Sequence, residues 1–351
     1  MDLYRESAQL GLVGCTIDPA YGGSGMDAAA YCAIHEELSA ADPAFCLSYL
    51  ASSCLFGNNL SQNGSEEQKM KYLPDFCEGK TIGGMCMSEP AVGTDVLGMQ
   101  TSAVRDGDNY ILNGQKMWIT NGAINDTETG DVFLVYARVG DNAKELSMFI
   151  VEKDFPGFSL GQRIKDKSGM RASGTAELVF EDCVVPAENR VGPEGAAMVC
   201  MMRNLEIERV VLAAMSCGIA RKSIEVMNQY GQDRKAFGKP LHSFGQIQRY
   251  ISDSYAQYMA GKTYLYHTAG QMELDSSGQR LDTDGVKLFC TTMGKDVADN
   301  AIQVLGGYGY CGEYHVERLW RDAKLLEIGG GTLESHQKNM VRELLAHDKL
   351  P

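Results

Sequence analysis

The chain has 351 residues, 44% of them hydrophobic and 22% charged, and its formal net charge at pH 7 is −14. This is the composition of a globular protein with room for two or three structural units. The negative charge argues against broad contact with nucleic acid or an anionic membrane. No apolar run approaches the roughly 18 residues that span a bilayer.

The chemistry-bearing side chains show no metal or nucleophile pattern. Eleven cysteines and six histidines are scattered, without a CxxC pair or zinc-ligand spacing. We therefore expect no metal site and no Ser-His-Asp set. The cysteines, among them Cys15, Cys32, Cys46 and Cys54, are expected to be small buried hydrophobes of a reducing compartment.

Residues 1–84 are predicted to form an N-terminal helical domain. The segment AAAYCAIHEELSAAD has apolar residues at helical spacing and ends at Asp42-Pro43. The segment SEEQKMKYLPDFCEGK starts with Ser65 and acids and stops at Gly79, which are helix start and stop signals.

Residues 85–195 are predicted to form an antiparallel β domain. The segment NYILNGQKMWITNG alternates in polarity, and its Asn113-Gly114 pair predicts a hairpin turn. The segments VFLVYARV, SMFIVEK and AELVFEDCVVP follow as strands. WITNG is expected to place Trp118 and Thr120 at a hairpin tip.

Residues 196–351 return to a helical period, with long patterns over 198–230, 246–273 and 283–305, as in a four-helix bundle. The predicted fold class is therefore α+β. GYGYCG at 307–312 matches a dinucleotide-binding GxGxxG only formally. It follows a helical pattern and lies outside any βαβ unit, so we interpret it as a glycine-rich helix end.

Glu208 lies in NLEIERVVLAAMSCGIA, a segment with no charge from Val210 to Ala220. A carboxylate aimed between apolar walls can remove a weakly acidic C–H proton, because desolvation raises its basicity. The alternative is that Glu206 and Glu208 merely favour the positive end of a helix. Three further segments are likewise either ligand-binding loops or ordinary connections, namely MSEPAVGTD, WITNG and RKAFGKP.

Six motifs, taken together and in order, resemble the acyl-CoA dehydrogenase flavoprotein family. They are MCMSEPAVGTD, MWITNG, GMRASGTAELVFEDCVVP, DRKAFGKP, QVLGGYGY and RDAKLLEIGGGT. The resemblance covers essentially the whole chain. It implies a helical domain, a β domain and a four-helix domain, with FAD between the last two.

The resemblance also implies roles for individual residues. The flavin would be lined and flanked by Met85, Met87, Ser88, Thr94, Trp118 and Thr120, with Thr332 and Glu334 closing the site. The FAD of a neighbouring subunit would be reached by Arg234, Phe237, Gln303, Gly306 and Gly307. The thioester would be contacted by Thr94, Glu206, Arg209, Gly329, Gly330 and Gly331.

The position of the base distinguishes branches of this family. Most members carry it in a Tyr-Glu-Gly-Thr motif, where this chain has Gly329-Gly330-Gly331-Thr332. Isovaleryl-CoA dehydrogenases, like long-chain ones, place it in a Leu-x-x-Glu-Arg motif on the long helix, and Glu208 fits this motif. The resemblance thus implies α-proton removal by Glu208, β-hydride transfer to flavin N5 and a short branched substrate such as isovaleryl-CoA. Glu327 and Glu334 are the alternative bases.

The resemblance further implies an acyl-CoA or acyl-carrier-protein thioester as substrate, an electron-transferring flavoprotein as acceptor and a dimer of dimers. It implies the cytoplasm for a bacterial chain and the mitochondrial matrix for a eukaryotic one. Three features depart from the family pattern: an expected first helix is missing, Gly245 replaces a Gln, and Leu50 is bulkier than the Gly of the isovaleryl pattern. A prolyl-carrier-protein dehydrogenase or oxidase of the same fold and a non-catalytic flavin-binding relative remain alternatives.

Overall fold

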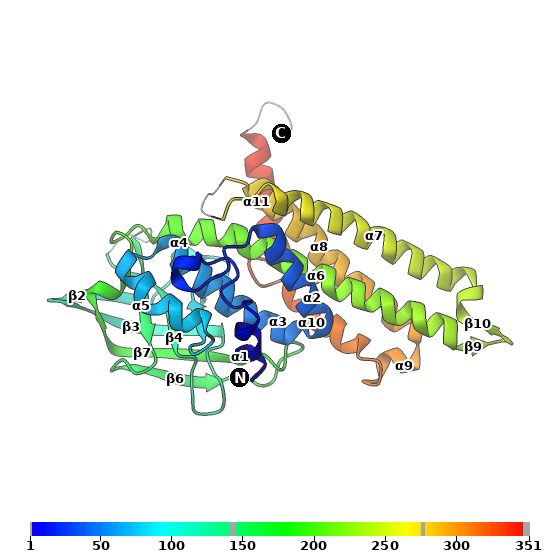
Figure 1. Cartoon of the computed structure of the whole chain (residues 1–351), viewed down its shortest axis with the longest axis horizontal. Helices are drawn as coiled ribbons and strands as arrows, with labels where there is room; N and C mark the ends of the chain where they lie inside the picture. Colours follow the sequence, from blue (N-terminus) through cyan, green and yellow to red (C-terminus); the bar gives the residue numbers. More distant parts are fainter. Residues whose placement is uncertain (1, 141–144, 275–277, 347–351) are drawn as a thin grey trace.

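The computed structural model describes residues 2–140, 145–274 and 278–346. Helices come first, a β-sheet follows, and long helices complete the chain, which confirms the predicted α+β class. The sheet lies at one end of the long axis and the far tips of the long helices at the other (Figure 1).

The N-terminal helices lie over the sheet and against the start of the bundle (Figure 1). They are α1 Asp2–Gln9, α2 Ala28–Ala41, α3 Pro43–Leu50, the π-helix η2 Ala51–Asn58, α4 Asn59–Asn63 and α5 Glu66–Cys77, with the short turn η1 Pro19–Tyr21. Asp42 ends α2 and its carboxylate caps α3. Ser65 and Gln68 form a capping box at the start of α5. These local signals explain why the helix boundaries agree with the sequence prediction.

The sheet is mainly antiparallel. Its strands are β1 Gly83–Cys86, β2 Ser102–Asp106, β3 Asn109–Thr120, β4 Val132–Arg138, β5 Leu146–Glu152, β6 Phe158–Arg163, β7 Thr175–Pro186 and β8 Arg190–Val191. The order is β6-β7-β3-β2-β4-β5-β8, and β1 pairs with β4. Two pairings depart from the predicted antiparallel pattern, because β1 runs parallel to β4 and β2 meets β4 in parallel at one residue pair.

The hairpin predicted at Asn113-Gly114 is wrong. The strand β3 runs straight through this pair, with a bulge between Leu112 and Gly114. Gly114 has a φ of 149°, and a Cβ there would come within 2.5 Å of the Thr101 hydroxyl oxygen. The glycine thus permits a close backbone approach. The actual turn joins β2 to β3, at Gly107.

Trp118 also lies elsewhere than predicted. It sits within β3, at a second register shift between Lys116 and Ile119, and not at a hairpin tip. Its φ of 60° is unusual for a large side chain. The bulge leaves the indole 54% exposed. The exposed ring is therefore a product of the strand irregularity.

The C-terminal bundle is built on α6 Ala197–Asp233, α7 Gly245–Gly270 and α8 Arg280–Leu305, with α10 Val316–Leu326 and α11 Leu333–Leu345 packed on α8. The short pieces are η3 Val96–Gly98, η4 Ala187–Asn189, the hairpin β9 Lys235–Ala236 and β10 Lys239–Pro240, η5 Leu241–Ser243 and α9 Gly307–Tyr310. The GYGYCG segment follows the helix α8 and not a parallel strand, as predicted, but its first four residues form the short helix α9 and are not the end of α8. None of the described helices is long and apolar enough to cross a membrane.

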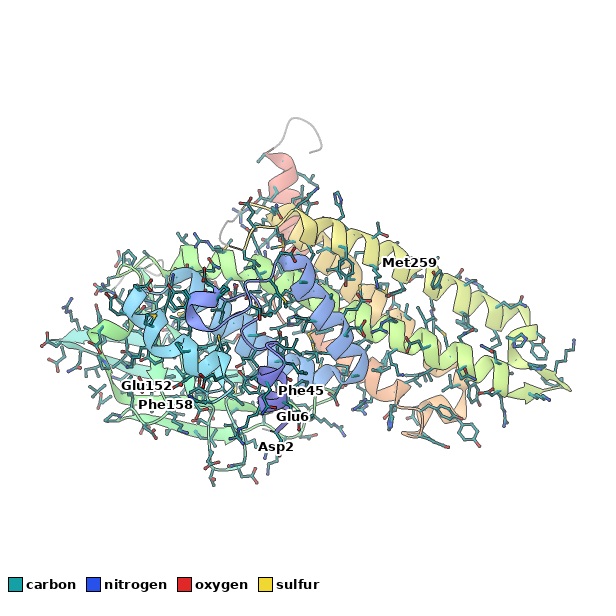
Figure 2. The ribbon with its side chains drawn as sticks, in the orientation of Figure 1. Asp2, Glu6, Phe45, Glu152, Phe158 and Met259 are labelled. Carbon is teal, nitrogen blue, oxygen red and sulfur yellow. The ribbon has the colours of Figure 1, made fainter. Side chains whose placement is uncertain are left out.

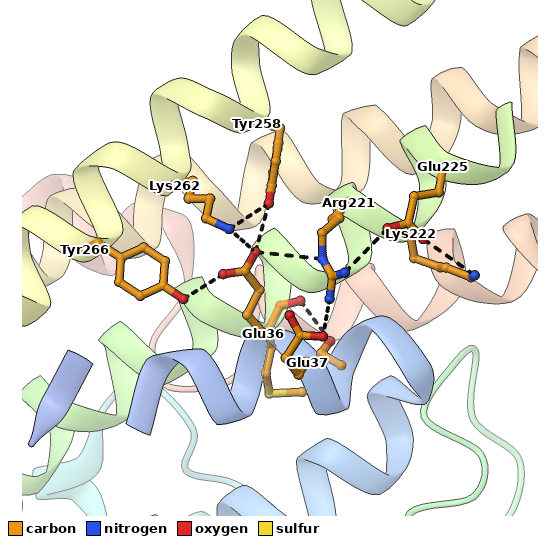
Figure 3. Close-up of polar contacts among 10 residues, drawn as sticks. Glu36, Glu37, Arg221, Lys222, Glu225, Tyr258, Lys262 and Tyr266 are labelled. Atoms are coloured by element: carbon orange, nitrogen blue, oxygen red, sulfur yellow. Dashed lines mark hydrogen bonds and ion pairs between the residues drawn. The ribbon is translucent and has the colours of Figure 1, made fainter. Parts of the chain in front are cut away.

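A buried polar network joins α2 to the bundle (Figure 3). The Glu36 carboxylate is 2% exposed and accepts hydrogen bonds from Tyr258, Lys262 and Tyr266 of α7 at 2.7–2.9 Å. Arg221 of α6 lies 3.9 Å from the same carboxylate. These contacts tie α2, α6 and α7 together.

Candidate active site

Glu208 lies on α6 beside residues of a buried apolar cluster. Its neighbours Ile207 and Leu212 belong to this cluster, together with Leu50 and Cys54 from the N-terminal helices and Leu326 at the end of α10. Glu208 itself is 8% exposed. The uncharged stretch after it is buried throughout, so the predicted apolar setting of this acid is what the structure shows.

The Glu208 carboxylate accepts no hydrogen bond from any of the described residues. Burial raises its pKa from 4.5 to about 7, although the positive charges of Arg209 and Lys287 act in the opposite direction. A buried carboxylate without donors is a stronger base than an exposed one. The group is therefore poised to exchange a proton near neutral pH.

Gly330 faces this carboxylate. A Cβ built on Gly330 would lie 3.4 Å from a Glu208 oxygen and 2.4 Å from Leu212 Cδ1, and its φ is 65°. No side chain is therefore accommodated here without movement of Leu212. Within the described parts of the chain, the Gly330 N–H donates no hydrogen bond. An unpaired backbone donor thus lies beside an unpaired carboxylate.

The other candidate acids are placed differently. The Glu327 carboxylate is 4% exposed, with Lys324 Nζ at 2.6 Å and Lys295 Nζ at 3.4 Å. Glu334 is exposed on the first turn of α11. Neither combines burial with freedom from partners, and the geometry therefore favours Glu208 as the base.

Glu206 and Arg209, which are predicted to contact the CoA chain, both have polar partners within the protein, and the contact with CoA stays a prediction. The Glu206 carboxylate accepts from the N–H groups of Gly278 and Gln279, at 3.2 Å each, just before α8 begins. The Arg209 guanidinium is 5% exposed and lies 3.1 Å from the Asp284 carboxylate. Arg209 is therefore buried beside Asp284 and not exposed on the surface.

The residues predicted to line the flavin gather at the edge of the β domain. Met85 on β1 and the following Met87 and Ser88 are partly buried, whereas Thr94 is exposed in the next loop. The Met117 N–H donates to the Ser88 carbonyl at 2.9 Å, so the strand carrying Trp118 and Thr120 is joined to this loop. The exposed indole of Trp118 offers a flat apolar face on which a planar ligand ring can pack.

A buried ion pair behind this loop was not predicted. Lys116 is fully buried, and its ammonium donates to the Glu89 carboxylate at 2.9 Å and to the Met87 carbonyl at 3.1 Å. Glu89 in turn accepts from the N–H groups of Gln100 and Thr101. The pair fixes the backbone of the predicted flavin loop. A lysine at an inward position of an alternating strand was the available signal.

The residues predicted to reach a neighbour's FAD lie at the far tip of the bundle. Phe237 is 92% exposed on the turn between β9 and β10, and Arg234, Gln303, Gly306 and Gly307 are also exposed. No atom lies within 4 Å of a Cβ built on either glycine. These elements and the sheet are at opposite ends of the long axis (Figure 1). The structure thus does not bring the two predicted sets together in one protomer.

Thr332 and the glycines of residues 329–331 connect α10 to α11. The Thr332 hydroxyl caps α11 by accepting from the Ser335 N–H at 3.3 Å. The Gly331 carbonyl accepts from Lys287, which the sequence analysis missed, together with Asp284 and His336 nearby. Asp284, Lys287 and Thr291 follow each other at helical spacing in a buried face of α8, which was the only signal for them.

Comparison with known proteins identifies the family. Residues 1–80 match the acyl-CoA dehydrogenase N-terminal domain, 84–183 the middle domain and 198–345 the C-terminal domain. The chain is 40% identical over 350 residues to the isovaleryl-CoA dehydrogenase, mitochondrial, of Oryza sativa subsp. japonica. This match covers 99% of the chain and 84% of that protein.

Two solved structures show the same fold over nearly the whole chain. The butyryl-CoA dehydrogenase of Megasphaera elsdenii has a TM-score of 0.93 at 35% identity, covering 98% of this chain and 90% of that one. The prolyl acyl carrier protein oxidase AnaB has a TM-score of 0.92 at 30% identity, with the same coverage. The chain therefore belongs to the acyl-CoA dehydrogenase family and is an FAD-dependent oxidoreductase.

Proposed function

We propose that the chain dehydrogenates an acyl-CoA thioester between its α and β carbons, with Glu208 as the catalytic base. FAD, when bound, supplies the acceptor for the β hydrogen as hydride. Glu208 takes the α proton, and the product is a trans-2-enoyl thioester. Met85, Met87, Ser88, Thr94, Trp118 and Thr120 would hold the cofactor from the β domain.

One observation carries this proposal: an unpaired buried carboxylate lies beside an unpaired backbone donor. The Gly330 N–H can donate to the thioester carbonyl and stabilise the enolate charge that develops there. Glu208 can accept the proton from the adjacent α carbon, because burial has raised its pKa to about 7. The base and the hydrogen-bond donor that an enolisation requires, the Glu208 carboxylate and the Gly330 N–H, therefore lie beside each other.

The packing around Glu208 supports a short acyl chain. Leu50 and Leu212 are 1% and 2% exposed, and Leu212 already occupies the space beside Gly330. A long acyl chain would have to displace these buried side chains. We therefore propose a short branched substrate such as isovaleryl-CoA, the substrate class named for the rice relative.

The proposal is tested by anaerobic bleaching of the bound flavin with a panel of thioesters. The panel holds isovaleryl-, 2-methylbutyryl-, butyryl-, glutaryl- and palmitoyl-CoA. The expected result is fastest bleaching with a branched substrate of five acyl carbons. Fastest bleaching with palmitoyl-CoA would overturn the substrate class, and bleaching by none of them would overturn the acyl-CoA dehydrogenase activity.

The rival function is oxidation of a prolyl thioester attached to a carrier protein. Two observations keep it in view: the fold likeness to AnaB at a TM-score of 0.92, and the burial of Arg209, which removes one argument for a CoA phosphate contact. Prolyl-carrier protein belongs in the same bleaching experiment. Bleaching by it, with none by any acyl-CoA, would decide for the rival.

We also propose a dimer of dimers in which each protomer completes its neighbour's FAD site. Support comes from the exposed Arg234, Phe237 and Gln303 at the bundle tip, and from exposed apolar side chains on α7, of which Met259 is 39% exposed (Figure 2). Sedimentation should give a tetramer, and Arg234→Ala should lower FAD retention. A stable monomer that keeps FAD would contradict this arrangement.

The electron acceptor and the location follow from the same family. We propose an electron-transferring flavoprotein as the acceptor of the reducing equivalents. A eukaryotic chain would act in the mitochondrial matrix, which agrees with the word mitochondrial in the name of the rice relative, and a bacterial one in the cytoplasm. Reduction of a purified electron-transferring flavoprotein by the substrate-reduced enzyme is the direct test of the acceptor.

A further inference from the structure

Two buried donors from different helices converge on one backbone oxygen next to the proposed base. Lys287 of α8 is fully buried, and its ammonium donates to the Gly331 carbonyl at 2.5 Å. The Nε2 of His336 on α11 lies 3.0 Å from the same oxygen. We call Lys287, His336 and their partner Asp284 the Gly331 clamp.

The Gly331 clamp is anchored on α6 next to Glu208. The Nδ1 of His336 lies 2.5 Å from the Asp284 carboxylate, and Asp284 lies 3.1 Å from the guanidinium of Arg209. The side chains of His336 and Asp284 are both fully buried. A continuous path of polar contacts therefore runs from the residue after Glu208 to the glycine turn opposite it.

The glycine turn needs such an anchor, because it has no side chains of its own. Gly330 and Gly331 have φ values of 65° and 104°, and glycine is the residue with the most backbone freedom. A Cβ on Gly331 would lie 3.1–3.2 Å from the His336 ring. The ring thus packs directly on the turn as well as bonding to it.

We propose that Lys287 and His336 are positioning residues for proton abstraction. By holding the Gly331 carbonyl, they fix the Gly330 N–H beside the Glu208 carboxylate, and the Lys287 ammonium also favours the ionised form of Glu208. This inference rests on the proposed function, since it assigns Glu208 and the Gly330 N–H their roles there. Neither positioning residue is proposed to touch the reacting carbons.

Electrostatics distinguishes Lys287 from His336. Lys287 and Arg209 are the two groups that lower the pKa of Glu208. Arg209 also forms an ion pair with Asp284. Burial lowers the pKa of His336 below its usual value, although the hydrogen bond with the Asp284 carboxylate acts in the opposite direction. The charged and titratable groups around Glu208 and these cations are Cys54, Tyr136, Glu206, Arg209, Arg280, Asp284, Lys287, Glu327 and His336.

The test compares Lys287→Met and His336→Leu with the control Lys262→Met in the FAD-loaded protein. Lys262 also pairs with a buried carboxylate, but in the Glu36 network on α7 (Figure 3). The first measurement is amide hydrogen exchange of the peptide covering residues 326–334. The second is the pH midpoint of flavin reduction by the acyl-CoA that bleaches the wild-type enzyme fastest.

Both clamp variants should exchange faster in this peptide, and the control should not. Lys287→Met should raise the pH midpoint of flavin reduction by on the order of one unit. His336→Leu should slow flavin reduction but leave its pH midpoint unchanged. Wild-type exchange in both variants would overturn the positioning role, and an unmoved midpoint in Lys287→Met would overturn the electrostatic one. If Lys287→Met does not fold, exchange in His336→Leu decides. If no acyl-CoA bleaches the wild-type enzyme, the proposed function fails while hydrogen exchange still tests the clamp.

Discussion

Two buried carboxylates in this protein are treated in opposite ways. Glu36 is 2% exposed and Glu208 is 8% exposed, so both are removed from water to a similar degree. Burial alone would raise the pKa of Glu36, but hydrogen bonds from Lys262, Tyr266 and Tyr258 outweigh it and lower the pKa. Glu208 has no such donors, and burial raises its pKa to about 7.

The difference shows that hydrogen-bond partners, more than depth, determine what a buried acid does here. Glu36 is an anion at neutral pH that joins three helices, whereas Glu208 can change its charge near neutral pH. The first arrangement stabilises the fold and the second suits proton transfer. Each prediction below separates these two roles.

The largest expected effect is on catalysis by Glu208→Gln. The amide keeps the size of the side chain but cannot accept the proton, so flavin reduction by acyl-CoA should fall by roughly 10²–10⁴-fold. FAD content should stay at the wild-type level. Stopped-flow absorbance measures the rate, with Glu327→Gln as the control acid. A near-normal rate in Glu208→Gln would place the base elsewhere.

Glu208→Gln should also make the protein more stable than wild type, by a margin that grows as the pH rises. Glu208 binds its proton more tightly in the folded state, with a pKa of about 7 against 4.5, so wild-type stability falls as pH increases between these values and stays reduced above pH 7. Glu208→Gln removes this loss, and should gain about 1–3 kcal/mol relative to wild type from pH 4.5 to 8. Denaturant unfolding at both pH values measures the gain. If the free energies of unfolding of variant and wild type differed by the same amount at both pH values, the raised pKa of Glu208 would be contradicted.

Glu36→Gln should act in the opposite sense. It weakens the charge-assisted hydrogen bonds that join α2 to α7, which should lower the free energy of unfolding by about 1.5–3 kcal/mol at pH 7. Because the folded-state pKa of Glu36 is lowered, this loss is full above pH 4.5 and shrinks as the pH falls through the folded value. The rate of flavin reduction in the folded variant should match wild type. A slow but fully stable variant would contradict the division of roles.

The smallest effect is expected for Glu206→Gln. Its carboxylate accepts two backbone N–H groups ahead of α8, so the variant should lose about 1 kcal/mol of stability, as for a helix cap. Flavin reduction should remain measurable with little change in rate. Thermal unfolding and stopped-flow reduction together check this. A rate loss as large as that of Glu208→Gln would show that the two acids act as a pair.

Much of the fold could be predicted from the sequence, because its signals are local. The helices α6, α7 and α8 have an uninterrupted helical period, and their observed ends lie within three residues of the predicted ones. Asp42 and Ser65 carry their capping roles in their own segments. Asn113-Gly114 predicted a turn wrongly, because the glycine is needed for a close approach to Thr101, the residue before β2. A two-residue motif holds no information about such an approach.

The candidate site was only partly accessible in this way. Glu208 stands out because an acid borders a long uncharged stretch. The burial of Arg209 could not be foreseen, since its partner Asp284 lies 75 positions further along the chain. Lys287 and His336 meet only at a backbone oxygen. Every residue type has a backbone carbonyl, so a contact to one produces no recognisable pattern in the sequence.

The central claim, that Glu208 is a desolvated base, is tested most directly by its own titration. Infrared difference spectra of the FAD-loaded protein across pH 4 to 9 should contain one protonated-carboxyl band that is absent from Glu208→Gln. Its intensity should fall with a midpoint near pH 7, the value to which burial raises the pKa of Glu208. A midpoint near the ordinary value of 4.5 would contradict the claim.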